Sequence, residues 1–279
     1  MRTGVLWLWA AAIAAGVPAG AGCRKKAEPP PEPAATRPAR EPSEPTRQAE
    51  PVRREYWQRG KTYLCRRARG NISIDSQGPP GQWAHAVVVR DFLIPVTGMT
   101  VTSTTDARML WDDEHLYLYF FARDRDIRGK FTKPTDPLWE EDSIDWFFKP
   151  RANKPFYYQV QVNALGAVSA WEIAARRSGA GRQLAELQPP VRSAVNVLGT
   201  LNDDRDRDTY YRGVIAVPWK LMKLIGGRAP KAGETWTFNV CRSDYSGPAG
   251  LTVEEQAAAK LTTQDYHHYE EYVPLKFVE

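Results

Sequence analysis

Short apolar runs separated by polar turns recur along the chain, and the most pronounced lie between residues 109 and 150. The run 116–122 is almost entirely aliphatic or aromatic, and a polar turn at 112–115 separates it from a shorter apolar run. Two β-prone runs around a short polar loop predict a β-hairpin. The continuous apolar character of the second arm predicts a strand covered on both faces, with Trp111, Tyr117 and Tyr119 in the core.

The same pattern predicts further strands on both sides of this hairpin. Residues 157–163 alternate, which places Gln159 and Gln161 on one face and the apolar residues between them on the other. The other predicted strands are 72–75, 87–94, 144–148, 167–173, 191–198, 210–217, 235–242 and 273–278, while 97–105 is a strand or an edge loop and short helices are expected at 218–224 and 252–260. About ten strands with short turns predict an all-β fold, a single antiparallel, jelly-roll-like β-sandwich with one or two short helices.

Charge argues against a nucleic-acid partner. The formal net charge is +5, but residues 1–56 carry nine Lys/Arg and six Asp/Glu, which leaves +2 for residues 57–279. The body is therefore close to neutral, and it has no stripe of Lys and Arg interleaved with aromatic residues. Binding to nucleic acid requires such an electrostatic footprint, so none is expected.

The amino terminus predicts export. Arg2 precedes an apolar run at 5–17, and small residues lead to Cys23, so residues 1–22 are interpreted as a signal peptide. The run is too short and too quickly interrupted for a transmembrane helix. The AlaGlyCys at 21–23 resembles the cleavage box of bacterial lipoproteins, in which the cysteine is lipidated, although Gly20 stands where that box usually has Leu. Ordinary cleavage near this point and secretion is the alternative.

Residues 23–55 are predicted to be a disordered, Pro-rich tether. Residues 24–55 contain eight Pro and no aromatic residue, Leu, Ile or Met, so they cannot bury enough apolar surface to fold. The folded domain is then 56–279. We expect an exported protein held at the membrane through a lipid on Cys23, in the periplasm or at the cell surface, and otherwise a secreted one.

Two cysteines remain in the predicted domain, Cys65 and Cys241. An even pair in an oxidising compartment allows a disulfide that closes a long loop, while two separately buried thiols are the alternative. Neither cysteine belongs to a CysXXCys or Cys/His pattern, so no zinc site is expected.

A series of motifs resembles the family 9 carbohydrate-binding module and the broader family 9-like (DOMON-like) group of β-sandwich domains. The motifs are TrpAlaHisAla (83–86), TrpAspAspGluHisLeuTyrLeuTyr (111–119), AspArgAsp (124–126), LeuTrpGluGluAspSerIleAsp (138–145), ValGlnValAsn (160–163), AlaValProTrp (216–219) and TrpThrPheAsnValCysArg (236–242). Each motif is weak alone, and their order and spacing carry the resemblance over roughly residues 64–278. The family binds sugars, often at chain ends, by sandwiching a ring between two aromatic side chains.

The resemblance implies a carbohydrate-binding site at five positions. Trp139 matches the first family aromatic, and Asp145 matches a carboxylate that is usually Glu. Gln161 stands where binding members have Arg. Thr263 falls where they have Asn, and Tyr266 falls near their second aromatic, a Trp.

Each of these residues also has a purely structural interpretation. Trp139 could cap the core, Asp145 could pair with Arg or cap a turn, and Tyr266 could lie in an exposed loop. A solvated charged loop is the favoured interpretation of Asp124 and Asp126, and the alternative is that they are ligands of a structural calcium, the one cofactor considered for the predicted module.

The resemblance favours a non-catalytic carbohydrate-binding module that accompanies polysaccharide breakdown, with a glycan as its partner. A degenerate sandwich that binds an unknown protein is the first alternative. A glycoside hydrolase is a second alternative, because it needs two carboxylates across a cleft, here drawn from Glu140, Glu141, Asp142 and Asp145. A haem-binding relative is a third, with axial ligands drawn from Met99, Met109, His85, His115, His267 and His268.

Overall fold

The computed structural model describes residues 54–75 and 81–279, within the compact unit Glu50–Glu279. These residues form thirteen strands and six single-turn 3-10 helices. The strands are β1 (Tyr63–Arg67), β2 (Val88–Val89), β3 (Thr105–Trp111), β4 (His115–Arg123), β5 (Ser143–Lys149), β6 (Tyr157–Asn163), β7 (Val168–Ile173), β8 (Gly181–Gln183), β9 (Arg192–Leu198), β10 (Tyr210–Pro218), β11 (Thr235–Ser246), β12 (Thr252–Ala257) and β13 (Val273–Val278). The 3-10 helices are η1 (Gly81–Trp83), η2 (Leu138–Glu140), η3 (Trp219–Leu221), η4 (Lys223–Ile225), η5 (Pro248–Gly250) and η6 (Tyr269–Glu271).

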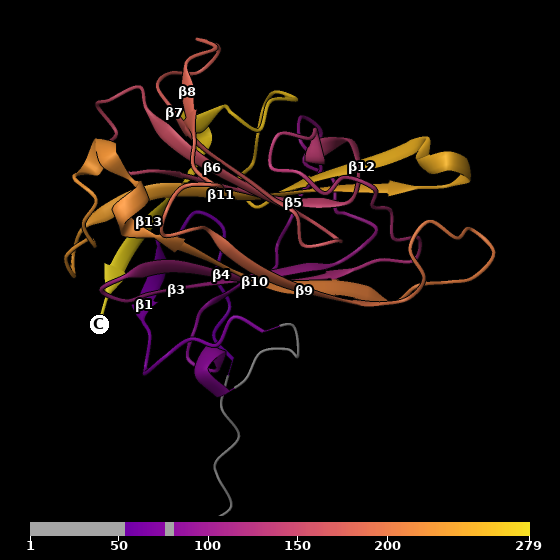
Figure 1. The fold of residues 1–279 in the computed structure, drawn as a ribbon, viewed down its shortest axis with the longest axis horizontal. Helices are drawn as coiled ribbons and strands as arrows, with labels where there is room; N and C mark the ends of the chain where they lie inside the picture. Colours follow the sequence, from indigo (N-terminus) through magenta and orange to yellow (C-terminus); the bar gives the residue numbers. More distant parts are fainter. Residues whose placement is uncertain (1–53, 76–80) are drawn as a thin grey trace, which may run out of the picture. The chain divides into compact units, whose positions relative to one another are not determined.

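The strands form one curled sheet that folds into two facing layers. Its order is β8-β7-β6-β5-β11-β13-β1-β3-β4-β10-β9, with β12 paired to β11 and β2 paired to β3. Figure 1 shows β5, β6, β7 and β11 in one layer and β3, β4, β10 and β9 in the other, with β13 and β1 at the corner between them. The predicted all-β sandwich is confirmed.

The sequence pattern predicts antiparallel pairing throughout, and the structure differs from this prediction at one strand. Strand β1 runs parallel to both of its neighbours, β13 and β3. Parallel neighbours need a long connection rather than a tight turn. Residues 68–104 supply that connection between β1 and β3, and the whole intervening domain separates β1 from β13.

The predicted central hairpin is confirmed as β3 and β4. Asp112 Oδ1 closes the turn by accepting the backbone N–H groups of Glu114 (2.8 Å) and His115 (2.7 Å). Side chains of β4 alternate between the core that the two layers share and a second apolar cluster that contains Trp83 and Tyr119. Both faces of β4 are therefore covered, which explains its continuous apolar sequence.

For two segments the predicted type of secondary structure is wrong. Residues 72–75 form no strand, although Ile72 packs into the second apolar cluster. The helix predicted at 252–260 is instead strand β12, which pairs in register with β11 from Ser246↔Thr252 to Cys241↔Ala257. Its Glu, Gln and Ala residues favour a helix, but hydrogen bonding along the edge of β11 overrides this local preference.

Several boundaries also differ from the prediction. Residues 87–94 contain only the two-residue strand β2, and the segment before Thr105 is irregular. The short helix expected at 218–224 consists of the two 3-10 turns η3 and η4. The described residues contain no helix that is long and apolar enough to cross a membrane. The predicted signal peptide, Cys23 and the tether as far as residue 53 lie outside the described residues.

The disulfide expected between Cys65 and Cys241 is absent, and both side chains are buried free thiols. Cys65 lies on β1 opposite Phe277 of β13, whereas Cys241 lies on β11 opposite Asp145 and Ala257. Strand β13 lies between β1 and β11, so the two cysteines are at least two strand spacings apart, or about 9–10 Å. A disulfide joins Cα atoms less than about 7 Å apart.

Candidate functional site

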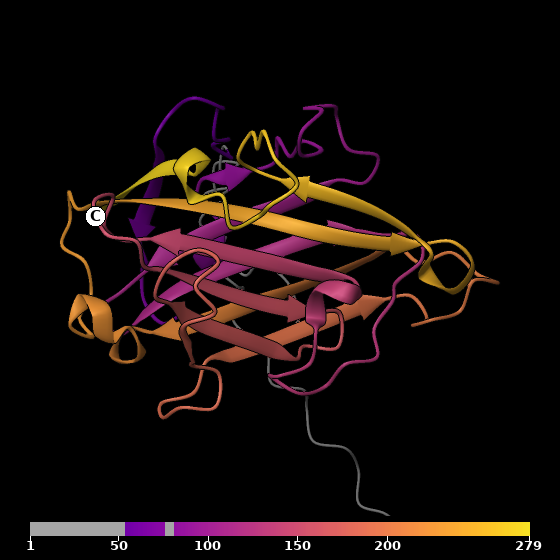
Figure 2. The same ribbon diagram turned by 90° about the horizontal axis from the view of Figure 1, so that it is seen from above.

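The outer face of the layer formed by β7, β6, β5 and β11 carries the candidate site. Figure 2 looks onto this layer, with the turn before β5 and the loop between β12 and β13 lying over it. The register places Gln161 beside Asp145 and Ser169, and it places Gln159 beside Phe147 and Trp171. Strict alternation along β5 and β6 sends the neighbouring apolar side chains into the core, so these polar groups share the outer face.

A cavity of about 370 Å³ lies on this face, and we call it the smaller cavity. It brings together four of the five residues that the family resemblance implied: Trp139, Asp145, Gln161 and Tyr266. Its other lining residues are Phe147, Gln159, Ser243, Tyr245, Glu255, Gln264, Asp265 and His267. The fifth implied residue, Thr263, is exposed outside this lining, with its Oγ1 3.2 Å from His268 Nδ1.

Asp145 is the buried carboxylate at the floor of the smaller cavity. Gln159 Nε2 donates to its Oδ1 at 2.9 Å, while its Oδ2 has no hydrogen-bond partner within the described part of the chain. Burial raises the pKa of Asp145 to about 6, against a lowering by the neighbouring side-chain amides of Gln159 and Gln161. An unpartnered buried carboxylate oxygen is costly, so a ligand hydroxyl that donates to Oδ2 would be bound favourably.

Trp139 and Tyr266, the two aromatic residues of the implied site, are held differently. The Trp139 side chain is 54% exposed, and its backbone carbonyl accepts the hydroxyl of Tyr245 at 3.0 Å. Trp139 is therefore a fixed but open aromatic surface. The hydroxyl of Tyr266 donates to the carbonyl of Arg242 at 2.9 Å, and burial raises its pKa well above the ordinary value. Tyr266 is therefore anchored in the wall of the cavity.

A second cavity of about 690 Å³ adjoins the first, and we call it the larger groove. The two share Trp139, Gln159, Gln264, Asp265 and His267. The larger groove is also lined by residues of β6, β7, the β7–β8 turn and the loop before β5, among them Tyr157, Trp171, Arg176, Arg177 and Asp136.

His267 is one of the residues that line both cavities. Its Nδ1 lies 2.7 Å from the hydroxyl of Tyr157, and its ring packs edge-on against Phe147 and Tyr157. Burial lowers the pKa of His267 below its ordinary value. The neutral imidazole is therefore a structural part of this lining near pH 7.

Sequence reasoning missed Trp171, Gln159 and Tyr245 as members of the site. A signal for two of them was present. The alternation of 157–163 puts Gln159 on the same face as Gln161, and a hairpin with 167–173 places Trp171 directly beside Gln159. No comparable pattern points to Tyr245, which reaches the site only because β11 extends beyond its pairing with β5.

Acidic residues before β5 hold the site loops in place. Glu141 accepts the backbone N–H of Lys130 (2.7 Å) and the side-chain amide of Asn163 (2.5 Å). Asp142 accepts the backbone N–H groups of Arg128 (2.5 Å) and Tyr245 (2.6 Å), one on each carboxylate oxygen. The acidic pair therefore ties the 128–131 loop and the end of β11 to the strand that carries Asp145.

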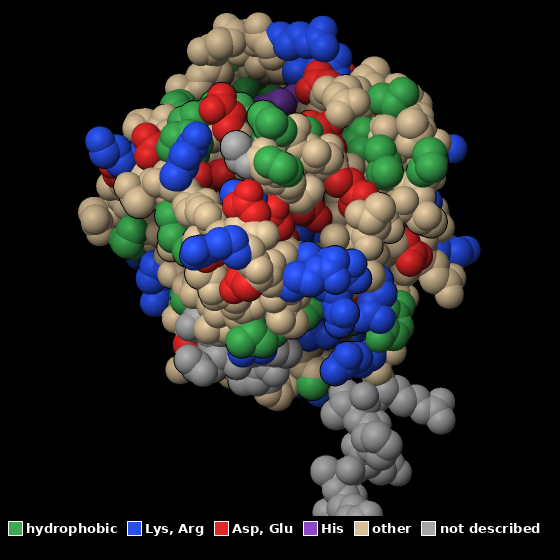
Figure 3. Space-filling model, turned by 90° about the vertical axis from the view of Figure 1, so that its right-hand side faces the viewer, with side chains coloured by type: hydrophobic (Ala, Val, Ile, Leu, Met, Phe, Trp, Pro, Cys, Tyr) green, Lys and Arg blue, Asp and Glu red, His purple; other side chains and the backbone are tan. Residues whose placement is uncertain are grey.

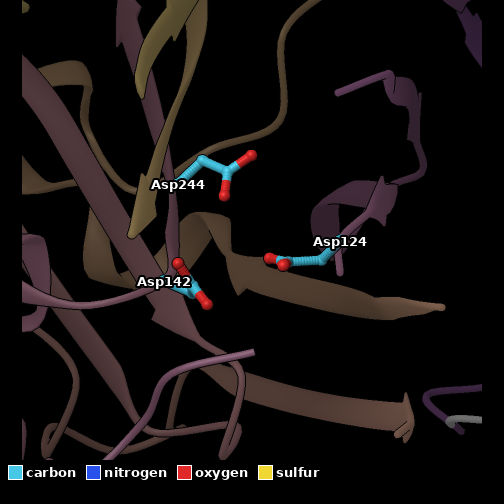
Figure 4. Close-up of side chains that lie close together, drawn as sticks. All are labelled: Asp124, Asp142 and Asp244. Atoms are coloured by element: carbon cyan, nitrogen blue, oxygen red, sulfur yellow. The ribbon is translucent and has the colours of Figure 1, made fainter. Parts of the chain in front are cut away.

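Asp124, Asp142 and Asp244 bring carboxylate oxygens within 4.8 Å of one another in the interior. Figure 4 shows these side chains pointing toward a common space. Arg242 fills the position that a cation would take: its Nη2 donates to Asp124 Oδ2 (2.8 Å) and lies 3.0 Å from Asp244 Oδ2. Each Asp142 oxygen already accepts a backbone N–H. The cluster therefore suits a guanidinium and does not suit calcium.

The two calcium candidates from the sequence do not converge on one site. Asp124 pairs with Arg242, and Asp126 pairs with Arg128, whose Nε lies 2.7 Å from Asp126 Oδ1. Burial raises the pKa values of Asp124 and Asp142, because a carboxylate is poorly solvated there.

On the side of the molecule in Figure 3, Asp and Glu side chains lie between groups of Lys and Arg, so both signs of charge share this surface.

A comparison with protein families places the domain. Residues 74–244 match the family model described as carbohydrate family 9 binding domain-like. The chain belongs to this family. No curated protein matches the chain. The family 9-like match includes Trp139, Asp145 and Gln161, whereas Thr263 and Tyr266 lie beyond its end.

Solved structures share the fold of this family 9-like domain. An inferred carbohydrate-binding protein from Bacteroides uniformis ATCC 8492 aligns with a TM-score of 0.65 at 12% identity, covering 78% of this chain and 99% of that one. A family 9 carbohydrate-binding module from Caldicellulosiruptor kristjanssonii in complex with cellotriose has a TM-score of 0.53 at 13% identity, with 78% and 94% covered. The corresponding glucose complex has a TM-score of 0.51 at 13% identity, with 77% and 95% covered.

Proposed function

We propose that this family 9-like domain is a non-catalytic carbohydrate-binding module of an exported, lipid-anchored protein. The observation that carries the proposal is the smaller cavity. There the open indole of Trp139 shares one space with the carboxylate of Asp145 and the amide of Gln161. These three side chains come from the turn before β5, from β5 and from β6, so the fold itself assembles the site.

The side chains of the smaller cavity match the two kinds of surface on a pyranose ring. The exposed face of Trp139 offers an apolar surface on which the C–H face of the ring stacks. Asp145 Oδ2, which lacks a partner within the described part of the chain, accepts a hydroxyl, and the amides of Gln159 and Gln161 complete the polar rim. In this mode Tyr266 shapes the wall of the cavity.

The ligands of the structural relatives suggest which glycans to test. The Caldicellulosiruptor kristjanssonii module binds cellotriose and glucose in the two complexes. We propose neutral glucan oligosaccharides as the first ligand class for this chain, in keeping with a role beside enzymes that break down polysaccharides.

The acidic residues around the site support a binding role rather than hydrolysis. A glycoside hydrolase needs a proton donor and a second carboxylate that both reach the glycosidic bond. Glu141 and Asp142 instead accept backbone N–H groups, and they hold loops together. Asp145 is then the single buried carboxylate among the four acidic candidates that faces the smaller cavity.

Titration calorimetry of the purified protein against cello-, xylo- and manno-oligosaccharides tests the binding proposal. We expect binding to at least one series and its loss in Trp139→Ala, because the stacking surface is removed. Tyr56→Ala is a matched control: Tyr56 is also exposed (43%) and lies outside both cavities. Equal affinities for wild type and Trp139→Ala would rule out this site. No binding to any glycan would favour the alternative of a protein-binding scaffold.

The anchoring proposal rests on the sequence around Cys23 and needs its own test. Lipidation would increase the mass of the mature protein and would place it in the membrane fraction. We expect both properties to disappear in Cys23→Ser. A soluble wild-type protein with an unmodified amino terminus would instead indicate ordinary secretion.

A further inference from the structure

We propose that Trp171 and Trp139 form a second sugar subsite in the larger groove, so that the domain binds two or more neutral pyranose units. This inference rests on the proposed carbohydrate binding and extends it. The larger groove of about 690 Å³ continues directly from the smaller cavity of about 370 Å³, and Trp139 lines both. Both volumes lie within the range of roughly 300–1,000 Å³ that is usual for ligand sites.

Trp171 is placed and oriented as an aromatic platform. It lies on β7 directly beside Gln159 of β6, which lines both cavities. Its Nε1 donates to Ser169 Oγ at 2.9 Å, so the polar edge of the indole is satisfied within its own strand. The remaining ring surface is partly exposed and lines the groove. A ring fixed in this way loses little conformational entropy when a sugar stacks on it.

Trp171 also takes the role of second stacking aromatic, which the family resemblance had assigned to Tyr266. Tyr266 is bound through its hydroxyl to the carbonyl of Arg242, and its ring packs against the core. It therefore contributes a wall rather than a free stacking face. In this chain the second free indole at the site comes from β7, and the binding surface extends along the β6–β7 hairpin instead of ending at the C-terminal loop.

The charges around the larger groove favour a neutral glycan. Its lining contains two cationic side chains, Arg176 and Arg177, and two carboxylates, Asp136 and Asp265. Arg177 pairs with Asp265 at 3.2 Å, and Arg176 pairs with Glu270 at 3.1 Å. Because each cation already faces a carboxylate, an anionic sugar would have to displace one of these pairs, whereas a neutral sugar would not.

Calorimetry with glucose, cellobiose, cellotriose and cellotetraose tests the second subsite. In the wild type we expect affinity to rise with chain length beyond the monosaccharide. Trp171→Ala should weaken binding of the longer sugars by about 5-fold, the effect of losing one aromatic contact, and leave glucose binding unchanged. Trp171→Phe keeps an aromatic ring and should recover most of the affinity. Tyr56→Ala should match the wild type at every length.

The outcomes separate this inference from the proposed function. If Trp171→Ala, with an unchanged unfolding midpoint, binds every length like the wild type while Trp139→Ala does not bind, the second subsite is wrong and the smaller cavity stands. A similar loss for glucose and cellotetraose in both Trp171→Ala and Trp171→Phe would also overturn it, since that would be damage to the first site. If the wild type binds none of these sugars, nor the xylo- and manno-oligosaccharides, both proposals fall.

Discussion

The side-chain amide of Gln159 donates to the buried carboxylate of Asp145 across the β5–β6 pair, at 2.9 Å. This bond satisfies one carboxylate oxygen, while Oδ2 keeps no hydrogen-bond partner in the described part of the chain. Burial outweighs the hydrogen bonding and raises the pKa of Asp145 to about 6. Asp145 therefore titrates close to neutral pH, which gives the proposed sugar site a measurable pH dependence.

Sugar affinity should increase as the pH rises through about 6, because the ionised carboxylate is the stronger acceptor for a sugar hydroxyl. Calorimetry between pH 5 and pH 8 measures this, with Asp145→Asn as the variant that cannot titrate. The variant should bind more weakly at pH 8 and show a flat profile. A wild-type profile as flat as that of Asp145→Asn would mean that Asp145 does not contact the ligand.

Asp145 should also make the stability of the fold depend on pH, in the direction opposite to that of sugar affinity. Because the pKa of Asp145 is higher in the folded protein than its usual value of 3.8, the folded state holds the proton more tightly. Its contribution to stability is greatest below pH 4 and is lost as the pH rises through about 6. In urea unfolding, Asp145→Asn should therefore gain about 1–3 kcal/mol over the wild type on going from pH 4 to pH 8. If the free energy of unfolding of Asp145→Asn differs from that of the wild type by the same amount at pH 4 and at pH 8, the pKa of Asp145 is not raised in the folded protein.

Arg242 is the cation that makes the acidic interior stable. Its side chain is fully buried, with Asp124 and Asp244 on one side and the carbonyl of Arg123 on the other. Arg242→Met should lower the free energy of unfolding by about 3–5 kcal/mol at pH 8, because it leaves buried carboxylates without a partner. The loss should be smaller at pH 5, since burial raises the pKa of Asp244 to about 6 and it takes up a proton.

The matched control for Arg242→Met is Arg205→Met. Arg205 also pairs with an aspartate, Asp203, but its side chain is 89% exposed. An exposed pair contributes little to stability, so this variant should leave the free energy of unfolding nearly unchanged. If both variants lose the same free energy of unfolding, the buried ion pairs of Arg242 contribute no more to stability than an exposed pair.

Metal removal should leave the domain unchanged. The space between Asp124, Asp142 and Asp244 is taken by Arg242 and by backbone N–H groups, so no calcium is needed to balance these carboxylates. Thermal unfolding in excess EDTA should give the same midpoint as in excess calcium. A midpoint that rises with calcium concentration would contradict the assignment of Arg242 as the internal cation.

Much of the fold follows from alternation in the sequence. The strands β4, β5, β6, β10, β11 and β13 lie where apolar periodicity predicts them, because their side chains face a core that covers one or both sides. Strand β12 could not be predicted in this way. It is an edge strand whose residues 252–257 favour a helix, and only its pairing with β11 makes it extended.

The family resemblance pointed to Asp145 and Gln161, and alternation along 157–163 put Gln161 on the same face as Gln159. In the structure Asp145 and Gln161 lie opposite each other in β5 and β6. The position of Tyr266 depends on a long loop that folds back over the sheet, and no periodic pattern specifies such a path. The role of Arg242 depends on Asp244 of its own strand and on Asp124 at the end of β4, and the sequence pattern does not show that these two segments meet in the interior.

The hydroxyl of Tyr245 should matter for sugar binding because it fixes the backbone that carries Trp139. It donates to the Trp139 carbonyl at 3.0 Å, and the ring itself lines the smaller cavity. Tyr245→Phe removes this one bond and keeps the ring, so sugar affinity should fall by about 0.5–1.5 kcal/mol, or 2- to 12-fold. Calorimetry measures the affinity, and the Trp139 indole should become more accessible to a collisional quencher of tryptophan fluorescence. The control is Tyr210→Phe, a partly exposed tyrosine of the opposite layer, which should change neither reading. If Tyr245→Phe binds like the wild type, then the turn that carries Trp139 is held by Glu141 and Asp142 alone.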